Sequence, residues 1–200
     1  FSAIAVTWLN KPPGKGVPGG LRSNVCIFLE EKMSPNDFGY VALPALRFIG
    51  IDAWKTGEEW TNLWGRVGEF MPRLEQMENC ISLEVPYIAA LCHHDDGEVD
   101  KVNRYLVGHF FKANTPVPDG YDFFDLSPQS VGRTLFENVR GFGEEFWQRY
   151  NLTRDSILKD GVSIPYPKGY WHAEVYLDNI PQPEGESADL SCWVLFACNK

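Results

Sequence analysis

The feature that most constrains the fold is an order of predicted elements that occurs twice along the chain. A break containing Pro and Gly at residues 114–120 (NTPVPDG) falls near the middle of the sequence that follows residue 22. Before this break, hydrophobic periodicity predicts a strand, a helix and two strands, at residues 40–53, 58–77, 81–92 and 103–112. After it, the same order is predicted at residues 121–135, 141–158, 170–177 and 190–198. The sequence therefore predicts a duplicated unit.

We expect an α+β fold that is a pseudo-two-fold duplication of a strand–helix–strand–strand unit, with repeats at about residues 38–114 and 121–198. A helix covers only one face of a small antiparallel sheet, so the second copy is expected to cover the other face. The helices then lie on the outer side, and a ligand cleft lies between the halves. Residues 1–21 are expected to form an N-terminal arm and a linker rich in Pro and Gly, and residues 22–200 the folded domain.

The chain is acidic, with a formal net charge of −9 over 200 residues. Because no cluster of Lys and Arg longer than a pair occurs, direct binding to nucleic acid is not expected. Small cationic molecules match this charge better. No apolar run of about 18 residues occurs, so no membrane span is expected. Five cysteines without C-x-x-C spacing indicate buried free thiols in a reducing cytoplasm.

Residues 170–177 (YWHAEVYL) carry the most informative local pattern. Alternation along a strand places four polar or aromatic side chains on one face, namely those of Tyr170, His172, Glu174 and Tyr176. The opposite face is apolar enough to cover a helix, and consists of Trp171, Ala173, Val175 and Leu177. We therefore expect the Glu174 face to line a pocket for an aromatic cation. The alternative is an edge strand with Glu174 in solvent and the rings acting as ordinary strand formers.

Several segments carry a resemblance to a known family. They are residues 44–50 (PALRFIG), 88–96 (IAALCHHDD), 104–111 (RYLVGHFF), 125–135 (DLSPQSVGRTL), 173–179 (AEVYLDN) and 190–198. Together they resemble the GyrI-like superfamily, the effector-binding domains found alone or fused to bacterial multidrug-sensing transcription regulators of AraC type. The likeness covers about residues 38–198. No helix-turn-helix pattern precedes Arg22, so a role in DNA regulation is not expected from it.

The resemblance implies that Glu174 is the buried carboxylate with which such domains hold lipophilic cations. Physical chemistry points the same way, because a desolvated carboxylate is costly until a cation arrives and aromatic faces add cation–π attraction. We expect Tyr87 and His93, on the equivalent strand of the first half, to face Glu174, and Trp54 to lie at the rim. The expected ligand-binding residues are Glu174, Tyr170, His172, Tyr176, Tyr87, His93 and Trp54. Trp60, Trp64 and Trp147 are expected to pack in the core.

A metal site is not expected. The run Cys92-His93-His94-Asp95-Asp96 contains ligand types, but adjacent strand residues point to opposite faces and no second cluster supplies partners. A turn is the better interpretation. No G-x-S-x-G, P-loop, Rossmann glycine pattern or H-E-x-x-H occurs, and no cofactor is expected.

Three functions fit these observations. The first is a stand-alone cytoplasmic protein that binds aromatic, often cationic compounds, as a monomer or a homodimer. The second is a hydrolase of electrophilic natural products such as cyclopropanoids, in which Glu174 activates water while Tyr176 and Tyr87 donate protons or hydrogen bonds. The third is a protein-interaction inhibitor of the gyrase-inhibitory type, acting through the acidic surface.

Overall fold

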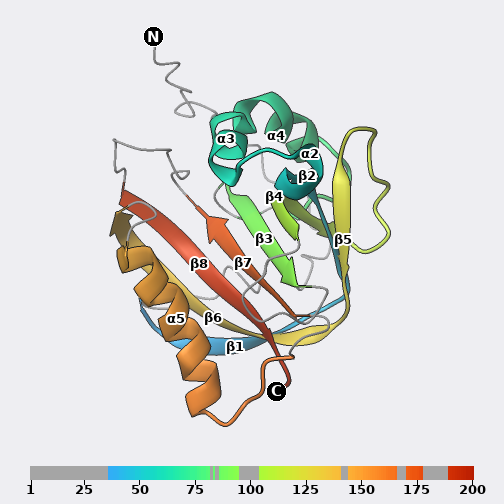
Figure 1. Ribbon diagram of the computed structural model, residues 1–200. Helices are drawn as coiled ribbons and strands as arrows, with labels where there is room; N and C mark the ends of the chain where they lie inside the picture. The colour runs from blue at the N-terminus through green and yellow to red at the C-terminus, as the bar shows by residue number, and fades with distance from the viewer. Residues whose placement is uncertain are drawn as a thin grey trace.

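The computed structural model describes residues 36–81, 83, 86–94, 104–140, 144–165, 170–177 and 189–200 (Figure 1). The first half contains β1 (Phe38–Leu43), β2 (Leu46–Asp52), α2 (Ala53–Thr56), α3 (Trp60–Gly65), α4 (Val67–Glu75), β3 (Ile88–His94) and β4 (Arg104–Lys112). The second half contains β5 (Asp122–Leu126), β6 (Gln129–Arg140), α5 (Glu144–Lys159), β7 (Tyr170–Tyr176) and β8 (Asp189–Cys198). No described helix is long and apolar enough to cross a membrane.

The eight strands form one antiparallel sheet with the order β1-β6-β8-β7-β3-β4-β2-β5. The order is symmetric about the β3–β7 pair, since β3, β4 and β2 on one side correspond to β7, β8 and β6 on the other. Each half also lends a strand to the other, because β1 pairs with β6 and β5 pairs with β2. The predicted α+β duplication is confirmed.

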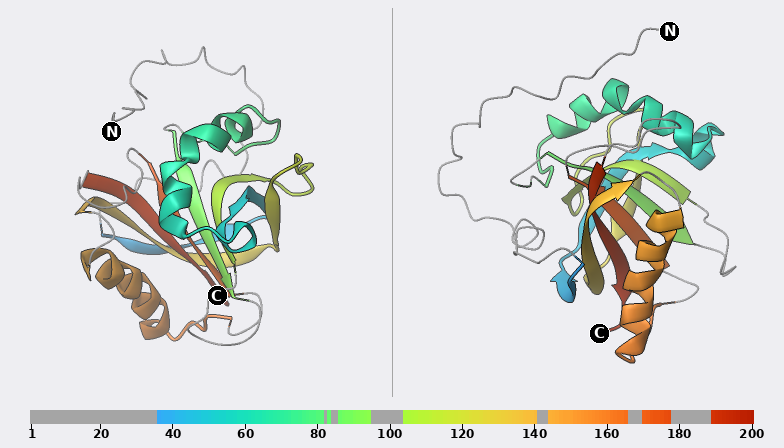
Figure 2. Two further views of the ribbon diagram at one scale, coloured as in Figure 1. Left: turned by 45° about the horizontal axis from the view of Figure 1, so that its top comes forward. Right: turned by 90° about the vertical axis from the view of Figure 1, so that its left-hand side faces the viewer.

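The two halves join differently from the prediction, which had each copy covering the open face of the other. Instead, the two halves meet edge to edge through the antiparallel β3–β7 ladder and share one continuous sheet. The helices of both halves lie over the flanking strands, with α5 on β6 and β8 and the helices of the first half mainly on β4 (Figure 2). The middle of the sheet, where the halves join, therefore lies between the two groups of helices.

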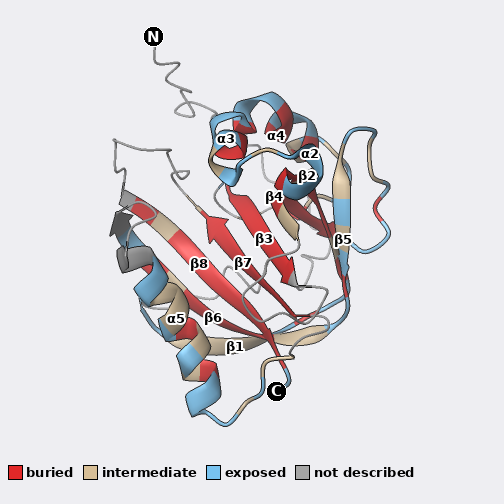
Figure 3. Cartoon of the chain, viewed as in Figure 1, coloured by how far each residue is buried: buried red, intermediate tan, exposed pale blue. Residues whose placement is uncertain are grey.

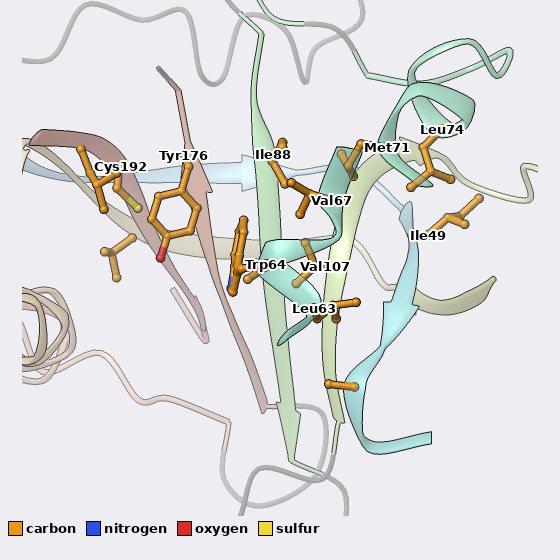
Figure 4. Close-up of a cluster of buried hydrophobic side chains, with 14 of the residues drawn as sticks. Ile49, Leu63, Trp64, Val67, Met71, Leu74, Ile88, Val107, Tyr176 and Cys192 are labelled. Atoms are coloured by element: carbon orange, nitrogen blue, oxygen red, sulfur yellow. The ribbon is translucent and has the colours of Figure 1, made fainter. Parts of the chain in front are cut away.

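The central strands of the sheet are buried (Figure 3). The two faces of the sheet bury separate apolar clusters. The cluster on the helix face includes Trp64 of α3 and Tyr176 of β7 (Figure 4). Tyr170 of β7 belongs to the same cluster. The cluster on the other face includes Trp171, Ala173 and Val175 of β7. The prediction that helices cover the Trp171 face was therefore wrong: the helices and Glu174 share a face.

Local sequence explains where the predicted elements are divided. The strand predicted at residues 40–53 is two strands, because Pro44 has no N–H to donate to a ladder. The helix predicted at residues 58–77 is divided into two helices, α3 and α4, and the short helix α2 precedes them. Asp52 caps α2 by accepting a hydrogen bond from the backbone of Trp54, and Gly57 ends it with φ 69°.

Close approach of the backbone explains one pair of glycines. Gly50 of β2 lies opposite Gly108 of β4. A Cβ atom at Gly108 would lie 2.0 Å from the carbonyl oxygen of Ile49, and one at Gly50 would lie 2.2 Å from that of Val107. The strands can approach this closely only without side chains at either position.

Candidate functional site

Glu174 lies in β7, at the junction of the two halves. Its neighbours across the ladders are Ala90 of β3 and Val194 of β8, so small and apolar side chains flank it. Only 6% of the residue is exposed. Among the described residues, its carboxylate accepts one side-chain hydrogen bond, from the hydroxyl of Tyr176 at 2.7 Å, and makes no ion pair.

This environment favours the neutral acid. Burial raises the pKa of Glu174 from 4.5 to about 7, while the hydrogen bond from Tyr176 lowers it by a smaller amount. The carboxyl group is thus poised near neutral pH between its protonated and ionised forms. It can hold a proton, accept one, or hold another positive charge in its place.

An aromatic path connects Glu174 to the surface on the side of the first half. The ring of Tyr176 packs edge-on against Trp64, with centroids 5.2 Å apart (Figure 4). The indole N–H of Trp64 donates to the hydroxyl of Tyr105 at 2.9 Å. Trp60, 42% exposed, lies next to Tyr105 with ring centroids 6.4 Å apart. This path runs from a buried acid to an exposed indole.

A second group of aromatic side chains lies on α5, β7 and β8 of the second half. Tyr150 of α5 packs edge-on against His172, at 4.9 Å between centroids, and its hydroxyl lies 3.3 Å from both Nδ1 of His172 and the hydroxyl of Tyr170. His172 stacks on Phe196 at 5.5 Å. Trp147, 57% exposed, packs edge-on against Tyr150 at 5.7 Å. Each half therefore contributes an exposed tryptophan, with a tyrosine next to it.

Electrostatics connects both groups to the same carboxylate. Burial is the main cause of the raised pKa of Tyr105, Tyr150, Tyr176 and Cys92, and in each case the negative charge of Glu174 raises it further. These four side chains come from β4, α5, β7 and β3. The ionised form of Glu174 is thus surrounded by groups that stay neutral at neutral pH.

The structure brings together four of the predicted residues. Tyr170, His172, Glu174 and Tyr176 are all buried on the helix face of β7, so the alternation predicted for this strand is confirmed. The alternative of an edge strand with Glu174 in solvent is wrong, because β7 lies between β3 and β8. That these four side chains bind a ligand stays a prediction.

The predicted positions of Tyr87 and His93 were wrong. The ladder between β3 and β7 places Ala90 and Cys92 on the Glu174 face, so His93 points to the other side, where its ring lies 3.9 Å from that of Phe124. Tyr87 precedes β3 and belongs to the other buried cluster, with its hydroxyl donating to the carbonyl oxygen of Ile81 at 2.9 Å. These two residues therefore pack in the core behind the sheet.

Trp54 lies on α2 and is 60% exposed. Its expected place at the rim of the site stays a prediction. Asp95 and Asp96 of the possible metal run lie outside the described residues, and Cys92 and His93 point to opposite faces of β3. The described residues contain no group of three or more metal-ligating side chains.

Sequence reasoning missed the aromatic residues on the helices. Trp60, Trp64 and Trp147 were expected in the core, but only Trp64 is buried and it also contacts Tyr176. The spacing of these residues could have indicated that they lie together. Trp60 and Trp64 are four residues apart, and Trp147 and Tyr150 are three apart, so each pair lies on one face of its helix.

No protein-family profile matches the chain, and no curated protein matches it. The solved structures that resemble it include SAV2435 bound to tetraphenylphosphonium, with 16% identity, a TM-score of 0.53, and coverage of 82% of this chain and 94% of that one. The C-terminal domain of EcmrR has 13% identity and a TM-score of 0.48, covering 82% and 98%. A hydrolase from Listeria innocua has 10% identity and a TM-score of 0.49, covering 86% and 97%. At these identities, the similarity to SAV2435 establishes a shared fold.

Proposed function

We propose that this chain binds small aromatic, often cationic compounds at Glu174. The observation that carries this proposal is a buried carboxyl group that, among the described residues, has one side-chain hydrogen-bond donor and no ion pair, with packed aromatic rings contributed by both halves. A cation beside Glu174 compensates for its lost hydration, and the neighbouring ring faces add attraction of about 0.5–2 kcal/mol each. Stacking on flat rings tolerates ligands of different shapes.

The fold supports the same proposal. It is shared with SAV2435, whose structure contains the aromatic cation tetraphenylphosphonium. We extend that ligand class to this chain, and with it membership of the GyrI-like superfamily. A cytoplasmic location and a role in sequestering or sensing foreign compounds follow as part of the proposal.

Binding is tested with two probes that differ mainly in charge. Methyltriphenylphosphonium is a permanent cation, and triphenylphosphine oxide is a neutral molecule of similar shape. Both affinities are measured through quenching of tryptophan fluorescence. The wild type should prefer the cation, because a charge-assisted contact that is shielded from water contributes about 1.5–3 kcal/mol, or about 10- to 150-fold in affinity.

Glu174→Gln should remove this preference, because the amide has a similar shape and no charge. The matched control is Glu69→Gln, which changes an exposed glutamate of α4 that pairs with Arg66. The control variant should bind both probes like the wild type. A change in preference of less than about twofold in Glu174→Gln contradicts the proposal, since the carboxylate would not then contact the cation.

A second candidate function is hydrolysis of an electrophile at the same site. Two observations favour it. The pKa of Glu174 is raised to about 7, so the carboxyl group can accept and return a proton near neutral pH, and the hydroxyl of Tyr176 lies within hydrogen-bond distance of it. As a water oxygen bonds to an epoxide carbon, Glu174 accepts the water proton and the C–O bond breaks. The electron pair goes to the epoxide oxygen, which takes the proton of Tyr176, and Glu174 returns a proton to Tyr176. The net reaction is addition of water.

Mass spectrometry distinguishes the two functions. Incubation with aryl epoxides or arylcyclopropanes should yield an adduct heavier by one water if the protein is a hydrolase, and unchanged ligand if it only binds. Glu174→Gln should then lose turnover by about 10²-fold or more. Equal turnover in the wild type and this variant contradicts the mechanism. A protein-interaction inhibitor would give neither bound ligand nor product.

A further inference from the structure

We infer that the site exchanges a proton for its cationic ligand: the empty site holds a protonated Glu174, and a permanent cation binds as that proton leaves for solvent. The inference rests on the proposed function, because it requires the ligand to contact Glu174. It adds how the site is regulated, since affinity then depends on the proton concentration. It also separates two chemical classes of ligand, permanent cations and protonatable amines.

The first observation is the geometry around the carboxyl group. Glu174 is buried between Ala90 and Val194, and within the described part of the chain only the Tyr176 hydroxyl donates to its side chain. One neutral hydrogen bond does not replace the hydration of a carboxylate, so the neutral acid is favoured when no other charge is present. The raised pKa of Glu174 has this physical cause.

The second observation is the kind of groups that face Glu174. Among the described residues, the titratable side chains near Glu174 on this face include Tyr170, His172 and Tyr176 of β7, Cys92 of β3, Tyr105 of β4, Cys192 of β8 and Tyr150 of α5. From α3, the packed side chain is the uncharged Trp64. The guanidinium of Arg149 on α5 lies over the ring of Phe136 and donates to the carbonyl oxygen of Glu137.

His172 is the one side chain in this set whose protonated form is a cation. Its Nδ1 lies 3.3 Å from the hydroxyl of Tyr150, and its ring stacks on Phe196. Burial is the cause of the raised pKa of Glu174, and the hydrogen bond from Tyr176 opposes it. The proton is therefore assigned to Glu174, and His172 serves as the internal comparison.

The third step is the effect of the ligand. A permanent cation stabilises the carboxylate but repels a proton at the same position, so binding and protonation compete. With a pKa of about 7, the affinity for such a cation should be about tenfold weaker at pH 6 than at pH 8. An amine that is neutral in solution at the pH of the measurement can instead take the proton from Glu174 and form the same ion pair, so its binding releases no proton.

The test is calorimetric titration of the wild-type protein with tetraphenylphosphonium at pH 6, 7 and 8. At pH 7 it is repeated in two buffers with different heats of protonation. We expect about half a proton released per bound cation at pH 7, nearly one at pH 6, and a tenfold gain in affinity from pH 6 to pH 8. Glu174→Gln should bind weakly at every pH and release no proton. His172→Gln should keep the pH dependence of the wild type.

The outcomes separate the two proposals. Binding at pH 8 with an affinity that stays flat down to pH 6 overturns the exchange and leaves the proposed function standing. A pH dependence that disappears in His172→Gln and persists in Glu174→Gln overturns it too, because the proton would belong to the histidine. No binding of the cation at pH 8 overturns both the proposed function and the exchange.

Discussion

Replacing Glu174 with glutamine should change how the stability of the empty protein depends on pH. In the unfolded chain this carboxyl group ionises above its ordinary pKa of 4.5, whereas in the folded protein burial keeps it protonated up to about pH 7. The folded state therefore binds more protons than the unfolded state between these values. The stability that Glu174 contributes is fully present below pH 4.5 and is lost as the pH rises through about 7.

The size of the effect follows from the two pKa values. A raise from 4.5 to about 7 corresponds to about 3 kcal/mol of unfolding free energy lost between acidic and mildly alkaline solution. For a chain of 200 residues this equals about 6–12 °C in melting temperature. Glutamine does not titrate, so Glu174→Gln should lack this part of the pH dependence even if its amide costs some stability through an imperfect hydrogen bond.

The assay is urea unfolding at several pH values between about 5 and 8, for the wild type, Glu174→Gln and the control Glu69→Gln. The quantity compared is the difference between variant and wild type as a function of pH. That difference should grow by up to about 3 kcal/mol toward pH 8 for Glu174→Gln. For the exposed Glu69 it should stay within about 1 kcal/mol. Parallel curves for wild type and Glu174→Gln would refute the reasoning.

Three further predictions concern other side chains. Tyr176→Phe removes the hydrogen bond to the carboxyl group of Glu174 and should weaken binding of tetraphenylphosphonium about 3- to 10-fold. Tyr87→Phe changes a side chain in the cluster on the other face of the sheet, so it should lower the free energy of unfolding by about 1–3 kcal/mol and leave binding unchanged. Among the described residues, neither ring nitrogen of the buried His109 has a hydrogen-bond partner, and burial lowers its pKa from 6.5 to about 4. The stability of the wild type should therefore fall as the pH drops from 6.5 to 4, and His109→Phe should lack this part of the fall. Equal acid sensitivity of the two proteins in urea unfolding contradicts this prediction. Gly108→Ala should lower the free energy of unfolding by more than about 3 kcal/mol, because its Cβ atom would clash with the backbone of β2. Gly68→Ala, which has open space around it on α4, should raise the free energy of unfolding by about 0.5–1 kcal/mol. A similar melting temperature for both variants contradicts the steric argument.

Local sequence was sufficient for two properties of this protein. The order of elements in the two halves could be predicted because hydrophobic periodicity and turn residues act within a few positions of the chain. The grouping of Tyr170, His172, Glu174 and Tyr176 could be predicted for the same reason, since alternation within one strand depends only on the pleat. Lengths of helices and strands were less certain, because Pro44 and Gly57 interrupt patterns that look continuous.

Tertiary structure alone decided what surrounds Glu174. The register between β3 and β7 determines that Cys92, rather than His93, shares its face, and a slip of one residue would reverse this. The packing of α3 and α5 brings Trp64 and Tyr150 to the same side of the sheet. The physical reason is that a strand fixes which of its own side chains lie together, while pairing and burial between distant segments fix which face becomes the site.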